Sequence, residues 1–179
     1  MKRCSGILMH ISSLPSPYGI GTFGRAAYAF ADFLADAGQS YWQMLPLGPT
    51  GYGDSPYQCA SAYAGNPYFI DLDLLIEDGL LEADAVRAID WGNDAQRVDY
   101  GRIFENRRKI LYQAFLRGRE RDRAAVSAFR REQADWLEGY ALFCAVKEHF
   151  DLLPFSEWDD DIRLHTEAGV ERFGRMLSE

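Results

Sequence analysis

The sequence predicts an α/β fold that begins a (β/α)8 barrel and continues into a mostly α-helical part. The first 48 residues have the pattern of a strand, a helix and a second strand, the βαβ unit of parallel sheets and α/β barrels. From residue 74 onward, helical periodicity repeats and strand patterns are almost absent. A complete barrel of this kind needs about 250 residues. The 179 residues are therefore expected to hold an incomplete barrel.

The βαβ unit is predicted from three consecutive segments. The run "SGILMHISSLP" (residues 5–15) is short and apolar and ends at proline, which is typical of a buried strand. A helix is predicted over residues 24–38, with Gly38 as its C-terminal stop. One face of this helix carries Ala26, Phe30, Phe33, Leu34 and Ala37. The run "QSYWQMLPLG" (residues 39–48) predicts the second strand, which Pro46 closes.

Amphipathic segments predict helices in the second part. In residues 99–118, helical spacing relates Ile103, Arg107, Ile110, Leu111, Ala114 and Phe115. In residues 123–150, one long helix is expected, with a stripe of Phe129, Trp136, Leu137, Tyr140, Phe143, Cys144 and Phe150. Another helix starts at residue 167. We predict a division into residues 1–73, the first barrel elements with a ring-rich loop, and residues 74–179, which are mainly helical.

The ring-rich loop is residues 46–73, "PLGPTGYGDSPYQCASAYAGNPYFIDLD". Prolines and glycines make such a segment stiff and sharply turned, and barrels build their sites on loops after strands. Tyrosine rings with nearby hydroxyl, amide and carboxylate groups suit a sugar. The alternative is that the rings pack in a core and the polar groups close turns, and composition alone favours it. For Asp54, before Ser-Pro, a turn role is predicted.

The composition argues against several classes of binding partner. A net charge of −8 argues against nucleic acid, and no polybasic run exists for anionic lipid. No segment approaches the roughly 20 apolar residues of a membrane span, and the apolar run near the N-terminus is too short for a signal peptide. The well-separated Cys4, Cys59 and Cys144 read as reduced thiols. We therefore expect a cytoplasmic protein.

Candidate catalytic and cofactor residues are few. No convincing carboxylate pair for glycosyl transfer is found, because Asp71, Asp73 and residues 159–161 read as turn, cap or solvated residues. His10 lies in the predicted first strand and could face the mouth of the barrel or be a satisfied core residue. Two other histidines lie in the helical part and read as surface groups. A protein-bound zinc is not expected, because the sequence has no HxxH, HExxH or Cys/His cluster. A dinucleotide site is not expected either, since residues 19–24 match GxGxxG formally but lack the acidic partner of such a site.

Five motifs together resemble the N-terminal part of the 4-α-glucanotransferases of glycoside hydrolase family 77, the amylomaltases and plant disproportionating enzymes. They are "GILMHISSLPSPYGIG", "FADFLADAGQSYWQMLPLGPTGYGDSPYQ", "SAYAGNPYFIDLDLL", "RVDYGRIFENRRKIL" and "YALFCAVKEHF". The resemblance runs in order over essentially the whole chain. It implies a (β/α)8 barrel in which the helical part is an inserted subdomain. It also implies transfer of α-1,4-glucan segments between maltooligosaccharides by a retaining double displacement, without a cofactor.

The resemblance also implies roles for individual residues. Ser55 and Tyr57 match positions that bind the donor-side sugar, by a hydrogen bond and by ring stacking. Tyr52 matches an aromatic residue of a second glucan site, where Phe104 replaces the family's partner tyrosine and keeps only the stacking face. The family's catalytic carboxylates come from later barrel strands, so the remainder of the same polypeptide is expected to supply them. The alternative function is a non-catalytic maltooligosaccharide-binding module.

Overall fold

The computed structural model describes residues 3–51, 53–94 and 96–178. The chain divides into two compact units, residues 1–123 and residues 124–179, and each is described by itself. The division predicted at residue 73 falls inside the first unit and stays a prediction about the complete fold. None of the helices in the described ranges is both long and apolar enough to cross a membrane.

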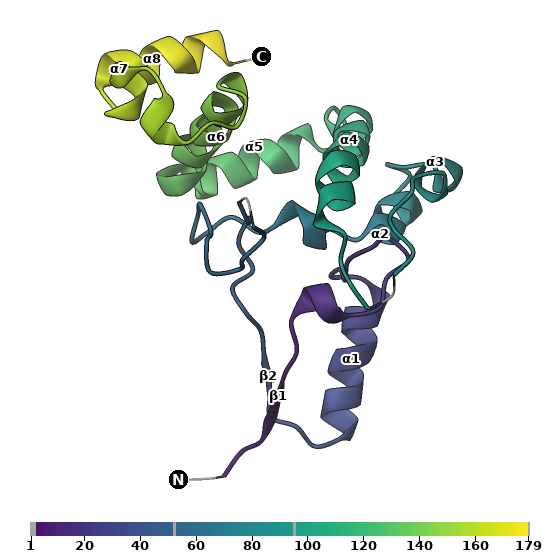
Figure 1. The fold of residues 1–179 in the computed structure, drawn as a ribbon. Coiled ribbons are helices and arrows are strands. Elements are labelled where there is room, and N and C mark those ends of the chain that lie inside the picture. Colours follow the sequence, from purple (N-terminus) through teal and green to yellow (C-terminus); the bar gives the residue numbers. More distant parts are fainter. Residues whose placement is uncertain (1–2, 52, 95, 179) are drawn as a thin grey trace. The chain divides into compact units, whose positions relative to one another are not determined.

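The first unit opens with the predicted strand–helix–strand pattern. Strand β1 (Gly6–Leu8) and strand β2 (Tyr41–Gln43) pair in parallel, with Gly6 opposite Tyr41 and Leu8 opposite Gln43. Helix α1 (Arg25–Asp36) connects them and lies beside the strand pair (Figure 1). Gly38 has a φ of 67°, the left-handed conformation expected of a glycine stop. The parallel βαβ unit is therefore confirmed.

Two details of this unit were predicted wrongly. Both strands are only three residues long, and a 3-10 helix, η1 (Ile11–Ser13), follows β1 where the strand was expected to continue. All three residues of β1 are exposed rather than buried. The reason is that a two-stranded sheet with one helix beside it leaves most of its surface uncovered.

The face of α1 that packs on the sheet is narrower than predicted. The Phe30 ring meets the Trp42 ring edge-on at a centroid distance of 4.9 Å, and Leu34 is buried. Phe33 is 61% exposed because it lies beside the line of residues 27, 30 and 34 that contacts the core. Including Phe33 in the buried face was therefore wrong.

The core of the first unit forms where the helical segments meet the loops after β1 and β2. Its helices are η2 (Pro67–Phe69), α2 (Leu72–Glu77), α3 (Ala83–Arg87) and α4 (Tyr100–Gly118). Asp71 caps α2 by accepting a hydrogen bond from the Leu74 amide at 3.0 Å, which confirms its predicted cap role. The buried core residues are Ile11, Leu14, Tyr18, Ile20, Ala27, Phe69, Leu72, Leu81, Val86, Trp91, Ile103, Ile110 and Ala114.

Arg107 is a charged residue inside this core. Its side chain is fully buried, and its Nη2 donates to the carbonyls of Tyr68 (2.8 Å) and Ile70 (2.5 Å). The guanidinium also lies 5.7 Å from the centre of the Trp91 ring. Burial lowers the pKa of Arg107 to about 10, against the opposing effect of Asp71. Arg107 thus joins α4 to the end of the ring-rich loop.

The second unit is helical throughout its described residues. Its elements are α5 (Arg123–Glu132), α6 (Ala134–His149), η3 (Phe155–Glu157), α7 (Asp160–Arg163) and α8 (Glu167–Met176). The single helix predicted over residues 123–150 is wrong, since the helix is interrupted at Gln133. Its apolar stripe is correspondingly broken, and Phe129 is 49% exposed. A small core holds Val146, Trp158, Ile162 and Phe173.

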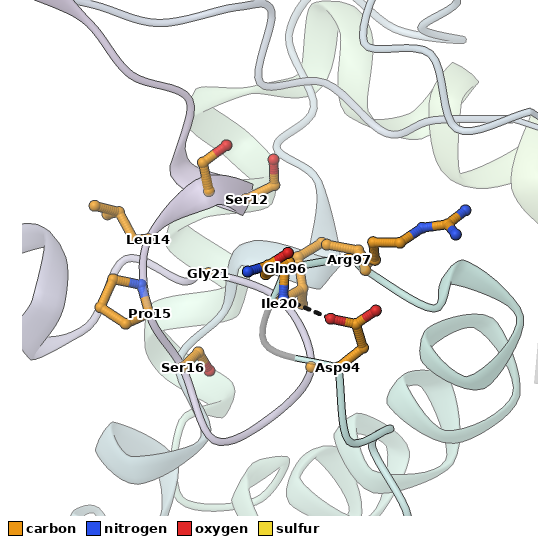
Figure 2. Close-up of a pocket in the computed structure, with 12 residues that line it drawn as sticks. Ser12, Leu14, Pro15, Ser16, Ile20, Gly21, Asp94, Gln96 and Arg97 are labelled. Carbon is orange, nitrogen blue, oxygen red and sulfur yellow. Dashed lines mark hydrogen bonds between the residues drawn. The ribbon is translucent and has the colours of Figure 1, made fainter.

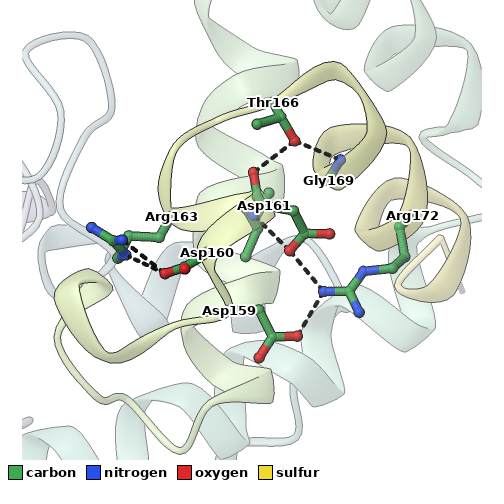
Figure 3. Close-up of polar contacts among 8 residues, drawn as sticks. Asp159, Asp160, Asp161, Arg163, Thr166, Gly169 and Arg172 are labelled. Carbon is green, nitrogen blue, oxygen red and sulfur yellow. Dashed lines mark hydrogen bonds and ion pairs between the residues drawn. The ribbon is translucent and has the colours of Figure 1, made fainter.

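The acidic run at residues 159–161 is part of the surface of this unit. Arg172 donates to Asp159 at 2.6 Å and to Asp161 at 2.8 Å, which ties α8 to the start of α7 (Figure 3). Thr166 caps α8 through a 3.1 Å hydrogen bond from the Gly169 amide. Exposed ion pairs of this kind contribute little to stability. The run is structural, as the sequence indicated.

Candidate functional site

The ring-rich loop leaves the carboxyl end of β2 and returns to it. The Asn66 amide donates to the Leu47 carbonyl at 2.8 Å, and Thr50 and Cys59 form an isolated antiparallel bridge. Gly48 is required at the crossing, because a Cβ there would lie 2.8 Å from Cys59 Sγ and 2.9 Å from the Ser61 carbonyl oxygen. The loop is therefore a closed structure fixed at its base.

The motif "DSPY" occupies the tip of this loop. Asp54 has a φ of 53°, in the left-handed region, and its amide donates to the Gly51 carbonyl at 3.1 Å. The Ser55 carbonyl accepts a 3.0 Å hydrogen bond from the Gln58 amide, so a second turn directly follows the first. Asp54 therefore lies in a turn, as predicted, and the printed hydrogen bond there is made by its backbone amide. The predicted capping by its carboxylate stays a prediction.

The structure brings two of the predicted sugar-binding residues together. The Tyr57 amide lies 3.4 Å from Ser55 Oγ. The Tyr57 side chain is 73% exposed, while Ser55 is half-buried. A ring in this state has a face free for stacking, next to a hydroxyl that can reach the same ligand. The roles of Ser55 and Tyr57 in sugar binding stay predictions.

The predicted second glucan site is only partly visible. Phe104 lies on α4 and is 55% exposed, so its ring is accessible. Tyr52 lies outside the described residues. The pairing of these two side chains therefore stays a prediction.

A cavity of about 200 Å³ lies at the carboxyl ends of β1 and β2, beneath the turn that carries Ser55. We call it the strand-end cavity. It is lined by His10, Ser12, Ser13, Ile20, Leu45, Pro46, Thr50, Asp54, Pro56, Asn66, Phe69 and Tyr100. Its lining includes both polar and apolar groups, which suits a ligand with both hydroxyls and CH faces. Barrel enzymes place their sites at this end of the strands.

Burial tunes the titratable groups of the strand-end cavity. Burial raises the pKa of the Asp54 carboxyl. The nearby Thr50 hydroxyl lowers this pKa in part, although Thr50 Oγ1 makes no hydrogen bond of regular geometry among the described residues. Burial and the Asp54 charge both raise the pKa of the Tyr100 hydroxyl. Burial lowers the pKa of His10. Each shift favours the neutral form of the group, so the cavity favours neutral hydrogen-bonding partners.

A second cavity of about 420 Å³ shares Ser12, Ser13 and Ile20 with the first. Figure 2 shows its lining, in which Gln96 extends toward Gly21 while the Arg97 guanidinium points away. The backbone amide of Gln96 donates to the Asp94 carboxylate at 2.8 Å. None of the unpartnered buried side-chain atoms in the described residues belongs to its lining. The strand-end cavity is therefore the better candidate site.

None of the residues that line the strand-end cavity was predicted as a site residue; Asp54 and Pro56 come from the same turn as the predicted Ser55 and Tyr57. Two of the lining residues, His10 and Asp54, were nevertheless weighed as candidates. His10 was left open between the barrel mouth and the core, and Asp54 was assigned only to a turn. Both residues reach the cavity because the chain reverses direction after a strand. No residue spacing in the sequence specifies these reversals. The sequence placed His10 inside the first strand, which left the barrel mouth open as one alternative; in the structure β1 ends at Leu8, so His10 follows the strand.

The glycines of the GxGxxG match serve packing. A Cβ on Gly21 would lie 1.9 Å from the Ile11 carbonyl oxygen, and one on Gly24 would lie 1.9 Å from an Asp71 carboxylate oxygen. The chain passes so closely here that only glycine fits. Within the described ranges, no cluster of three or more His, Cys, Asp or Glu could hold a metal ion. No disulfide joins Cys4, Cys59 and Cys144, as predicted.

Comparisons with known proteins match this chain to one family. The family model described as Glyco_hydro_77, 4-alpha-glucanotransferase, matches residues 9–179. A 4-alpha-glucanotransferase of Streptococcus pneumoniae is 50% identical over 99% of this chain, and one of Clostridium butyricum is 47% identical over 96%. A solved amylomaltase from Streptococcus agalactiae, in complex with acarbose, is 46% identical and matches 99% of this chain with a TM-score of 0.91.

The chain spans about a third of the length of these relatives. It covers 36% of the Streptococcus pneumoniae protein, 35% of the Clostridium butyricum protein and 36% of the solved amylomaltase. The match begins at residue 9, just after β1, and includes the ring-rich loop and both units.

Proposed function

This chain belongs to the 4-alpha-glucanotransferase family, glycoside hydrolase family 77, and we propose that it forms one wall of the glucan groove in such an enzyme. Ser55 and Tyr57 bind the donor-side sugar: the Tyr57 ring stacks on a glucose face and the Ser55 hydroxyl bonds a sugar hydroxyl. The substrates are maltooligosaccharides and α-1,4-glucans. The reaction is transfer of glucan segments by a retaining double displacement.

One observation carries this proposal. The turn of "DSPY" presents an exposed ring close in sequence to a half-buried hydroxyl, and its residues Asp54 and Pro56 line a cavity of mixed polar and apolar character at the carboxyl ends of two parallel strands. Ring faces and convergent hydrogen-bonding groups are what a pyranose requires. The solved amylomaltase with the same fold over this region is a complex with acarbose, which supports a saccharide ligand here.

The catalytic carboxylates lie outside this chain in our proposal. A retaining mechanism needs two carboxyl groups about 5–5.5 Å apart, and the aspartates of residues 159–161 are instead engaged with arginines. The remainder of the same polypeptide supplies the catalytic groups and the further strands of an incomplete barrel. Residues 74–179 form a mainly helical inserted subdomain, and the protein acts in the cytoplasm.

A second glucan site at Tyr52 and Phe104 is also proposed. The exposed Phe104 ring supports it. Because phenylalanine has no hydroxyl, this site binds glucan by stacking alone on that side, and weaker binding than at a tyrosine pair is expected.

The function is tested by incubating maltotriose with the complete gene product that contains this chain, and separately with residues 1–179. Glucose release together with longer maltooligosaccharides is expected from the complete product, and no turnover from residues 1–179. Turnover by residues 1–179 would show that the catalytic groups lie within them. Absence of transfer by the complete product would refute the proposed enzyme.

The alternative is a non-catalytic maltooligosaccharide-binding module, which the same exposed ring could serve. Titration of maltooligosaccharides against the complete gene product separates the two. Binding without turnover that Tyr57→Ala abolishes favours the module. Tyr112→Ala is the matched control, since Tyr112 is a 59% exposed tyrosine of α4 and not part of residues 46–73.

A further inference from the structure

His10 occupies a position where barrels place functional side chains. It lies two residues after β1, so its side chain is at the carboxyl end of that strand. Its carbonyl accepts a 3.0 Å hydrogen bond from the Ser13 amide, which starts η1 and fixes the backbone. The side chain borders the strand-end cavity together with Asp54, Asn66 and Tyr100.

The His10 ring is packed but not satisfied. The residue is only 9% exposed, and its ring meets the Phe69 ring edge-on at 5.3 Å and 81°. Its Nδ1 is buried and has no hydrogen-bond partner among the described residues. Buried polar atoms without a partner are rare, because they lose their hydration and gain nothing in return. The ring therefore has hydrogen-bonding capacity that the described residues leave unused.

The charge state of the ring suits a neutral ligand. Because burial lowers its pKa below the ordinary 6.5, His10 is mainly uncharged at pH 7. A neutral imidazole has one donor and one acceptor nitrogen, and a sugar hydroxyl can complement either. The titratable groups that face it across the cavity are Asp54 and Tyr100, whose pKa values are both raised.

We propose that His10 is a further substrate-binding residue, which bonds a glucosyl hydroxyl in the strand-end cavity. The inference rests on the proposed function and deepens it, since it adds a residue from the first strand to the loop residues Ser55 and Tyr57. The cavity of about 200 Å³ lies beneath the turn that carries Ser55. In this proposal His10 bonds the glucosyl unit that enters the cavity, while Ser55 and Tyr57 hold the glucan at the turn whose residues Asp54 and Pro56 line that cavity.

The experiment uses three variants of the complete gene product. His10→Phe keeps a ring against Phe69 and removes both nitrogens, while His10→Asn and His10→Gln return a polar group near Nδ1 and Nε2 respectively. The measured quantities are KM and kcat for maltotriose, and Tm. His149→Phe is the control: His149 is exposed, lies in the second unit, and contacts the Phe150 ring edge-on at 5.1 Å.

A loss of about tenfold in kcat/KM, mainly through KM, is expected for His10→Phe. Tm should be unchanged or higher, and His10→Asn or His10→Gln should recover part of the loss. Wild-type kinetics for His10→Phe would overturn the inference and indicate an ordered water or an empty site. Equal losses in all three variants with a lowered Tm would also overturn it. If the wild-type product transfers no glucan at all, the proposed function fails instead.

Discussion

Asp54 combines a backbone requirement with a partly buried carboxyl group. Its φ of 53° lies in a region that aspartate, asparagine and glycine tolerate and alanine does not. Its carboxyl lines the strand-end cavity, where burial raises its pKa. The turn requires the left-handed backbone conformation. The ionised carboxyl lowers the free energy of unfolding at neutral pH, because the folded state binds the proton of Asp54 more tightly than the unfolded state does.

Substitutions at Asp54 should therefore separate conformation from charge. Asp54→Ala should lower the free energy of unfolding by about 1–2 kcal/mol, because alanine resists the left-handed region. Asp54→Asn should be at least as stable as the wild type at pH 7, with the difference vanishing below the ordinary carboxyl pKa of 3.8. Urea unfolding at several pH values measures both effects. Equal losses for Ala and Asn at pH 7 would show that the carboxylate itself stabilises the turn.

His10 should make the first unit sensitive to acid. Its pKa is lowered in the folded state, so below pH 6.5 the unfolded chain binds a proton that the folded chain does not. The free energy of unfolding should fall as the pH drops from about 6.5 toward the folded pKa. His10→Phe should remove that slope in urea unfolding monitored from pH 5 to 8. An unchanged slope in this variant would assign the acid sensitivity to other groups.

At the scale of elements, periodicity predicted helices well and strand lengths poorly. The α1 and α4 helices lie where amphipathic spacing put them. The apolar run after residue 5 and the segment 123–150 were each predicted as one element, whereas a 3-10 helix begins at residue 11 and the helix breaks at Gln133. Apolar periodicity continues across both points and so does not mark them. The strand-end cavity could not be predicted either. Its lining comes from four separate segments that only the fold brings together.

The crossing of the loop after β1 depends on Gly21. A Cβ there would lie 1.9 Å from the Ile11 carbonyl oxygen and 2.8 Å from the Leu14 carbonyl oxygen. Gly21→Ala should therefore force the two backbone segments apart and destabilise the first unit by about 1–3 kcal/mol or more. Chemical denaturation measures the change.

The control for this element is Gly65→Ala. A Cβ at Gly65 meets nothing within 4 Å, and its φ is not in the left-handed region. The substitution should be neutral or stabilise by about 0.4–1 kcal/mol, through a less disordered unfolded state. If Gly21→Ala were as mild as Gly65→Ala, the close crossing would not be a real constraint.

At the scale of the whole molecule, the first unit leaves apolar side chains uncovered on its sheet. Ile7, Leu8 and Tyr41 on the two strands are 39%, 56% and 64% exposed. A two-stranded sheet seldom stands without further strands or helices to cover it. This agrees with the proposal that later strands of the same polypeptide complete the barrel.

The isolated chain should show that uncovered surface in solution. Residues 1–179 alone are expected to bind a hydrophobic dye strongly and to self-associate, because contiguous apolar surface on a soluble protein favours association. The complete gene product should do neither. A monomeric, cooperative melt of residues 1–179 without dye binding would mean that the unit is self-sufficient as it stands.

The most direct test of the account is the KM for maltotriose of Tyr57→Ala and Tyr57→Phe in the complete gene product. Base–aromatic stacking is worth about 1–3 kcal/mol; taking a pyranose CH face on the Tyr57 ring as comparable, Tyr57→Ala should raise KM by roughly 5- to 150-fold. Tyr57→Phe keeps the ring and should stay near the wild-type value. A KM unchanged by Tyr57→Ala would contradict the claim that this loop binds the glucan.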